Sequence, residues 1–349
     1  MTEEVLFTQK GQIGLITLNR PNALNALTLT MIKAMQKQLE LWKNDSNIKA
    51  VVLAAAPGNA FCAGGDVRWL YQTGKDQDPE QMQFFWHEYR LNHFIHYLGK
   101  PYLSLMDGIT MGGGVGVSLH GSHPIASERF VFAMPETSIG FFPDIGASYL
   151  LNRCSGDLGI YLGLTGNRLG PEEAQAAGLI KALVKSERMP LLLDALIKAD
   201  WSQEPYDVVD ACIKSFAETP TGTINQHKLI DSCFAKTSIE KIREALQQSG
   251  DTWSAETLSS IDKKSPLSLK ITLAQLQKTK GLDLGECLKI DYDLVGHFMQ
   301  GSDFYEGVRA LLVDKDKNPR WQPASLDLVT EKMVVNYFER EDQGLVLIN

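Results

Sequence analysis

The sequence contains few cysteines, and none of them is paired in a short motif. Only five occur among 349 residues, and no two form a CxxC pair. An odd, scattered set in a chain of this length indicates reduced thiols rather than a disulfide framework. Histidines also give no metal pattern: His93 and His96, and His120 and His123, are each three residues apart, but no HExxH motif occurs. We therefore expect no metal site and interpret these histidines as structural.

Basic residues and long apolar runs are also scarce. Lys and Arg number 34 against 42 Asp and Glu, which gives a formal net charge of -8. This balance argues against a nucleic-acid or anionic membrane partner, and no apolar run approaches the roughly 20 residues that span a bilayer. The acidic start, Met1 to Glu4, resembles neither a secretory signal nor an Arg-rich transit segment. These absences predict a protein that is cytoplasmic and bacterial, or else the mature form of an imported one.

The first half of the chain alternates strand-like and helical patterns. Strands are expected at residues 12–18, 48–55, 101–106 and 130–133, with a helix at 29–42 and a short one bracketed by Pro171 and Gly178. This alternation favours an α/β layer architecture. Beyond about residue 190 only amphipathic helices are expected, at 238–248, 267–278, 284–299 and 304–313. We therefore predict a catalytic core at residues 1–200 and a helical region at 201–349 that packs on it.

Two glycine-rich loops follow predicted strands. Residues 61–67 (FCAGGDV) and 111–116 (MGGGVG) could place two backbone N–H groups on one oxygen atom and so form an oxyanion hole. The alternative is that both are tight turns and nothing more. Neither loop matches a dinucleotide fingerprint or a phosphate loop, and residues 116–120 (GVSLH) lack the final glycine of a nucleophile elbow.

Three carboxylates lie in apolar surroundings. Glu136 and Asp144 are eight residues apart in a stretch rich in Phe and Pro, and Glu88 lies on the apolar face of a predicted helix at 82–98. Such carboxylates are candidates for a raised pKa and for acid–base or nucleophilic chemistry. The alternatives are a solvated turn residue for Glu136 and a helix N-cap for Asp144. Asn92, one turn beyond Glu88, could be its hydrogen-bonding partner.

Several motifs together resemble the crotonase (enoyl-CoA hydratase/isomerase) superfamily over residues 5–185. They are NRP at 19–21 with LNAL at 24–27, FCAGGD at 61–66 and GGG at 112–114. Residues 108–116, 134–146 and 303–321 are similar to the branch that hydrolyses 3-hydroxyisobutyryl-CoA, a step of valine degradation. The resemblance then covers nearly the whole chain and is weakest at residues 190–280.

The resemblance implies a ClpP-like spiral of ββα units with a C-terminal helical region. It also implies roles for single residues. Gly65 and Gly113 would bind the thioester oxygen through their N–H groups, and Glu136 would be the central catalytic carboxylate. Asp144 would be the partner of Glu136, and Glu88 would lie near the acyl group. The coenzyme A moiety would be held by Leu24, Ala63 and Gly64.

The implied reaction is hydrolysis of a short hydroxyacyl-CoA thioester, with Glu136 as general base or as nucleophile. Gly116 stands where a hydratase would carry a second glutamate, which disfavours water addition to a double bond. The alternatives are a hydratase or dienoyl-CoA isomerase, or a non-catalytic acyl-CoA-binding protein on the same scaffold. Coenzyme A would enter only as part of substrate and product, with no metal or redox cofactor. A homo-oligomer is left open.

Overall fold

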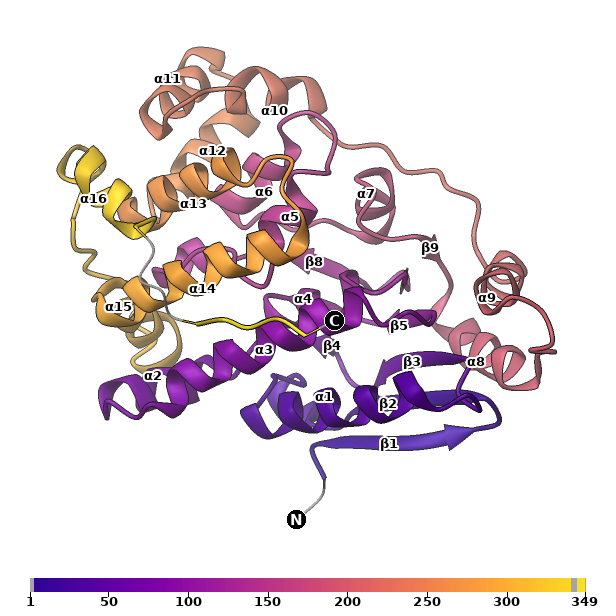
Figure 1. The fold of residues 1–349 in the computed structure, drawn as a ribbon. Coiled ribbons are helices and arrows are strands. Elements are labelled where there is room, and N and C mark those ends of the chain that lie inside the picture. The colour runs from indigo at the N-terminus through magenta and orange to yellow at the C-terminus, as the bar shows by residue number, and fades with distance from the viewer. Residues whose placement is uncertain (1–2, 340–343, 349) are drawn as a thin grey trace.

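The computed structural model describes residues 3–339 and 344–348, which form one large sheet, one small sheet and many helices (Figure 1). The large sheet has the order β1-β2-β3-β5-β7-β9. Its first two strands are antiparallel, and the remaining neighbours are parallel. The strands are β1 (Val5–Lys10), β2 (Ile13–Leu18), β3 (Ala50–Ala55), β5 (Tyr102–Met106), β7 (His123–Ala126) and β9 (Ala182–Leu183).

The small sheet explains the repeating character of the fold. Its strands β4 (Ala60–Cys62), β6 (Ile109–Met111) and β8 (Val131–Ala133) are parallel and each follows a strand of the large sheet after a short connection. A helical segment follows each short strand, so β3-β4, β5-β6 and β7-β8 begin three successive ββα units. The predicted α/β spiral is therefore confirmed, and the functional loops lie where the short strands end.

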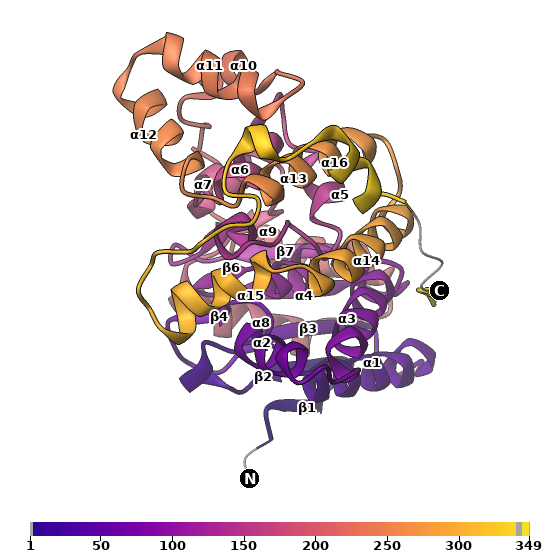
Figure 2. The ribbon, with the colours of Figure 1, turned by 90° about the vertical axis from the view of Figure 1, so that its left-hand side faces the viewer.

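Helices α1 (Leu29–Asn44) and α3 (Glu80–His96) lie on the side of the large sheet that faces the main core. α1 begins at Thr28, whose hydroxyl accepts the Met31 N–H at 3.2 Å as an N-cap. Its buried Met31, Met35 and Leu39 recur at helical spacing and join the main core. α3 packs beside α1 and is itself covered by α14 (Leu284–Gln300), which runs along it (Figures 1 and 2).

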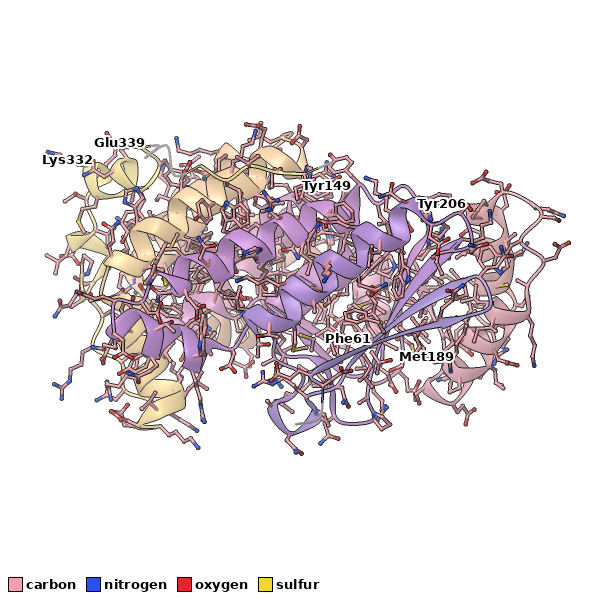
Figure 3. All side chains as sticks on the ribbon, turned by 60° about the horizontal axis from the view of Figure 1, so that its bottom comes forward. Phe61, Tyr149, Met189, Tyr206, Lys332 and Glu339 are labelled. Atoms are coloured by element: carbon pink, nitrogen blue, oxygen red, sulfur yellow. The ribbon has the colours of Figure 1, made fainter. Side chains whose placement is uncertain are left out.

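Helices α8 (Met189–Lys198) and α9 (Pro205–Lys214) lie against the other face of the sheet and form a second core. Leu192 and Leu196 of α8 pack there with strand residues such as Val52. Figure 3 labels Met189 of this second core and Phe61 of the main core. The predicted division near residue 200 stays a prediction. That position lies between α8 and α9, which share this second core.

The C-terminal helices build the upper part of the molecule in Figure 1. The helix expected over 304–313 is α15 (Asp303–Val308) continued by a π-helical turn, Arg309–Val313. Within residues 3–339 and 344–348, no helix is long and apolar enough to cross a bilayer. The remaining helices are α2 (Val67–Lys75), α4 (Gly113–Leu119), α5 (Ala147–Leu151), α6 (Leu158–Thr165), α7 (Pro171–Ala176), α10 (His227–Phe234), α11 (Ile239–Ser249), α12 (Thr252–Ile261), α13 (Pro266–Lys278) and α16 (Glu331–Tyr337), with 3₁₀ turns at Pro21–Ala23, Glu136–Ile139, Ser186–Arg188 and Leu326–Leu328.

Candidate active site

A cavity of about 250 Å³ lies between the glycine loops, α3 and the C-terminal helices. Most of its wall is apolar, and three carboxylates reach it from different elements. A cavity this small suits a short acyl group. Seven of the eight residues that the sequence nominates for the site line it: Ala63, Gly64, Gly65, Glu88, Gly113, Glu136 and Asp144.

Leu24 is the nominated residue that does not line the cavity. Its side chain is 44% exposed, and its backbone lies in the left-handed region at φ 52°. The Leu24 carbonyl accepts the Ala63 N–H at 3.0 Å. Leu24 thus fixes the loop that lines the site through its backbone, and a direct contact with coenzyme A stays a prediction.

The backbones of the two glycine loops come together at Gly65 and Gly113. Leu27 forms an isolated parallel bridge with Gly65, in which the Leu27 N–H donates to Gly64 and the Asp66 N–H donates to Leu27. The Gly65 N–H therefore points to the opposite side of its chain. Gly113 is the first residue of α4, so its N–H has no partner within the helix. A Cβ added at Gly113 would lie 3.3 Å from the Gly65 nitrogen, so the two loops meet.

Glu136 reaches this point from the 3₁₀ turn that follows β8. Its side chain is only 6% exposed, which excludes the solvated-turn alternative. A Cβ added at Gly112 would lie 3.0 Å from Glu136 Oε1, so the carboxylate packs directly on the second glycine loop. Burial and the nearby charge of Asp144 raise the pKa of Glu136 well above its ordinary value.

Asp144 lies in the turn before α5, and its carboxylate is held by a residue that sequence reasoning missed. The Tyr89 hydroxyl donates to Asp144 Oδ2 at 2.6 Å, and both side chains are buried. Burial raises the pKa of Asp144 to about 7, although the Tyr89 hydrogen bond opposes this shift. The N-cap alternative is wrong, because the residue before α5 is Gly146 and no side chain caps that helix. Tyr89 directly follows Glu88 in the sequence, but only the tertiary fold shows its partner.

Glu88 is buried on α3, and burial together with Asp144 and Glu136 raises its pKa well above its ordinary value. The expected partnership with Asn92 is not present. Neither Glu88 Oε1 nor either polar atom of the Asn92 amide has a hydrogen-bond partner among the described residues, and Glu136 Oε2 has none either. Buried polar atoms without partners are rare and costly, so Glu88 and Glu136 each keep an oxygen free for substrate or water.

Asn92 explains the absence of a side chain at Gly116. A Cβ added at Gly116 would lie 2.8 Å from Asn92 Nδ2 and 2.9 Å from Asn92 Oδ1. The buried amide therefore fills the space into which a residue at Gly116 would project. A carboxylate at that position, such as the second glutamate of a hydratase, would therefore require Asn92 to move.

The four histidines that the sequence marks as structural all bond to groups outside the cavity. His93 contacts the Ile348 carbonyl, His96 the His120 carbonyl, His120 the Ile145 carbonyl and His123 the Asp210 carboxylate. Among the residues that the structure describes, no group of three or more His, Cys, Asp or Glu side chains is arranged to hold a metal ion. The prediction that no metal or cofactor is needed remains a prediction.

Comparison with known proteins decides the family. The family model described as enoyl-CoA hydratase/isomerase matches residues 13–338. This chain belongs to that family. The 3-hydroxyisobutyryl-CoA hydrolase of Xenopus tropicalis is 44% identical, covering 96% of this chain and 88% of the frog protein, and the human one is 43% identical, covering 97% and 89%.

Solved structures confirm the fold along the whole chain. A carnitinyl-CoA dehydratase from Mycobacterium thermoresistibile is similar with a TM-score of 0.92 and 36% identity, covering 99% of each chain. An enoyl-CoA hydratase from Rhodobacter sphaeroides has a TM-score of 0.88 and 34% identity, covering 97% of this chain and 98% of the other. The match therefore includes the C-terminal helices as well as the spiral.

The expected cytoplasmic location is wrong. The hydrolases of Xenopus tropicalis, human and mouse are all named as mitochondrial proteins. The composition and the acidic first residues carry no signal that separates these two locations.

Proposed function

We propose that this protein hydrolyses the thioester of 3-hydroxyisobutyryl-CoA to the free hydroxy acid and coenzyme A. The observation that supports the proposal is that the backbones of Gly65 and Gly113 meet in one small cavity that the buried carboxylates Glu136 and Asp144 also line. Relatives more than 40% identical over nearly the whole chain bear the name of this hydrolase. The proposed reaction uses coenzyme A only as part of substrate and product.

In the proposed reaction the thioester oxygen lies between the N–H groups of Gly65 and Gly113. These donors stabilise the negative charge that develops on the oxygen when the carbonyl carbon is attacked, and loss of one such donor typically costs about 100- to 1000-fold in rate. The C–S bond then breaks, and the leaving coenzyme A thiolate takes up a proton to become the free thiol. In the proposal Asp144, whose pKa burial raises to about 7, holds or supplies that proton.

Glu136 can act in two ways from this position. As a general base it takes a proton from water, which attacks the carbonyl carbon; as a nucleophile it forms a mixed anhydride that water then opens. A single turnover in ¹⁸O-labelled water tests for an anhydride that water opens at the Glu136 carbonyl, and label in the protein would establish that route. Attack of water on the anhydride at the Glu136 carbonyl would leave ¹⁸O in the protein, whereas direct attack on the thioester puts it only in the hydroxy acid.

Water addition to an enoyl-CoA is the second candidate, because similar solved structures are named as a hydratase and a dehydratase. Asn92 opposes it by filling the space beside Gly116. The test follows thiol release from 3-hydroxyisobutyryl-CoA and, separately, loss of the enoyl absorbance of crotonyl-CoA. We expect fast thiol release and negligible hydration. Fast hydration without thiol release would overturn the hydrolase proposal.

A further inference from the structure

The turn that carries Asp144 has a strained backbone. Ile145 has φ +59° and Gly146 has φ +71°, so two consecutive residues lie in the left-handed region. This conformation is costly for a β-branched residue such as Ile145 and persists only where surrounding groups hold it. The direction of the Asp144 side chain depends on this turn, so whatever holds the turn also places the carboxylate.

Buried side chains hold three backbone groups of the turn. Gln275 of α13 donates from Nε2 to the Pro143 carbonyl at 3.0 Å. His120 Nε2 contacts the Ile145 carbonyl at 2.7 Å. The Gly146 N–H donates to Asp291 Oδ2 of α14 at 2.7 Å. The turn is therefore fixed on both sides of Asp144 by groups that do not line the cavity.

Asp291 and Gln275 also bind each other. Gln275 Nε2 donates to Asp291 Oδ1 at 2.7 Å, and neither side chain has any exposed surface. Gln275 Nε2 thus donates hydrogen bonds both to the Asp291 carboxylate and to the Pro143 carbonyl. Gln275 Oε1 has no partner among the described residues. A buried carboxylate is costly unless its oxygens are satisfied, and here both accept hydrogen bonds.

We infer that Asp291 and Gln275 are positioning residues for the hydrolytic reaction, which hold the turn at residues 143–146 so that Asp144 faces Glu136 and the acyl group. The inference rests on the proposed role of Asp144. It gives the C-terminal helices α13 and α14 a part in catalysis, although neither contributes a side chain to the cavity wall.

Asp291→Asn is the sharpest test because the hydrogen-bond pattern admits no isosteric repair. The new amide must turn its NH₂ group either to the Gly146 N–H or to Gln275 Nε2, and both are donors. If Gln275 rotates its amide to accept, its oxygen faces the Pro143 carbonyl, which is also an acceptor. In every arrangement at least one hydrogen bond of the network that holds the turn is therefore lost, while side-chain volume is kept.

The experiment measures kcat and KM for 3-hydroxyisobutyryl-CoA, with circular dichroism and Tm to verify folding. We expect Asp291→Asn to lower kcat by about 10- to 100-fold, since small misplacements of catalytic groups have effects of this size. KM should change by less than about threefold. Gln275→Met should lower kcat by about 10-fold and serves as the second variant if Asp291→Asn does not fold. Unchanged kcat in a folded Gln275→Met or Asp291→Asn protein would overturn the inference.

Asn152→Leu is the matched control. Asn152 donates to the Leu276 carbonyl and to Thr279 Oγ1 at 3.0 Å each, so it also ties a side-chain amide to α13, but it has no bond to the turn. This variant should lower Tm and keep kcat. An equal fall in kcat in this control would show that any loosening of α13 harms the reaction, which contradicts a specific positioning role.

The variant Asp144→Asn separates this inference from the proposed function. If Asp291 acts through Asp144, then Asp144→Asn combined with Asp291→Asn should be no more than about twofold slower than Asp144→Asn alone. Full activity of Asp144→Asn would remove the proposed role of Asp144 itself. A large loss in Asp144→Asn with none in Asp291→Asn would refute only the positioning role.

Discussion

The two halves of the molecule serve the site in different ways. The spiral contributes every polar group of the cavity wall: the loops at 63–65 and 111–113, Glu88 on α3, and the segment from Glu136 to Asp144. The C-terminal helices contribute only Phe304 and Leu312 to that wall. Behind it, they supply the Asp291 and Gln275 side chains that fix the Asp144 turn. The spiral thus carries the proposed reacting groups, while the later helices complete the apolar wall and hold the Asp144 turn.

The first prediction tests the spiral half at its centre. Glu136→Gln keeps the shape of the side chain and removes the base or nucleophile, so kcat should fall about 1000-fold, within the range of about 100- to 10,000-fold for loss of such a group. Coenzyme A affinity should be retained, because the cavity wall is unchanged. The measurements are thiol release and calorimetric titration with coenzyme A. Substantial remaining turnover would mean that the reacting group lies elsewhere.

The second prediction concerns the backbone donors of the same half. In Gly113→Ala, the added methyl group would contact Glu88 Oε1 and lie 3.3 Å from the Gly65 nitrogen. It would therefore occupy the place proposed for the thioester oxygen, and kcat/KM should fall by about 100-fold or more. Steady-state kinetics on the folded variant provide the measurement. Near-normal hydrolysis would show that the oxygen binds somewhere other than between the two loops.

Sequence patterns predicted the spiral half better than its counterpart for a physical reason. Consecutive glycines at 112–114 and a carboxylate in apolar company, such as Glu136, are local signals that a short motif carries. The bond from Tyr89 to Asp144 and the bonds from Asp291 and Gln275 to the same turn join residues between 55 and 145 positions apart in sequence. Nothing in a helical pattern distinguishes a polar residue that faces a functional turn from one that faces solvent.

Asn92 shows a further limit. Its position one turn after Glu88 correctly places both on one buried face of α3, but helical spacing alone predicted a hydrogen bond that does not form. The amide instead faces Gly116. The presence of a glycine at that position was visible in the sequence, whereas the residue that fills the space came only from the packing of α3 on α4.

The third prediction asks whether Glu88 recognises the substrate. Its Oε1 has no partner among the described side chains and backbone groups, so it is available to the 3-hydroxyl of the acyl chain. Glu88→Gln should reduce kcat/KM about 10-fold more for 3-hydroxyisobutyryl-CoA than for isobutyryl-CoA, because a site built to bond a hydroxyl discriminates against its absence. Parallel kinetics with both thioesters measure this ratio. Equal losses would assign Glu88 to the chemistry or to packing.

The fourth prediction concerns stability and has the smallest effect. Burial raises the pKa of Asp144 from 3.8 to about 7, so the folded protein holds this proton more tightly than the unfolded chain does. The corresponding contribution to stability is fully present below about pH 4 and is lost as the pH rises towards 7. Asp144→Asn cannot ionise, and its side-chain oxygen can still accept the Tyr89 hydrogen bond. The variant should therefore gain stability over the wild type as the pH rises from 5 to 8.

Urea unfolding at pH 5, 6, 7 and 8, followed by circular dichroism, measures this gain. Asp251→Asn is the control: Asp251 caps α12, and hydrogen bonds to Ser249 and Ser254 lower its pKa to about 2. Its carboxylate is ionised in the folded and unfolded states throughout this range, so its effect should not vary with pH. A pH-independent difference for Asp144→Asn would mean that Asp144 stays ionised when buried. The spiral half would then hold its acid–base group as a permanent charge, and the proton of the leaving thiol would have to come from another group.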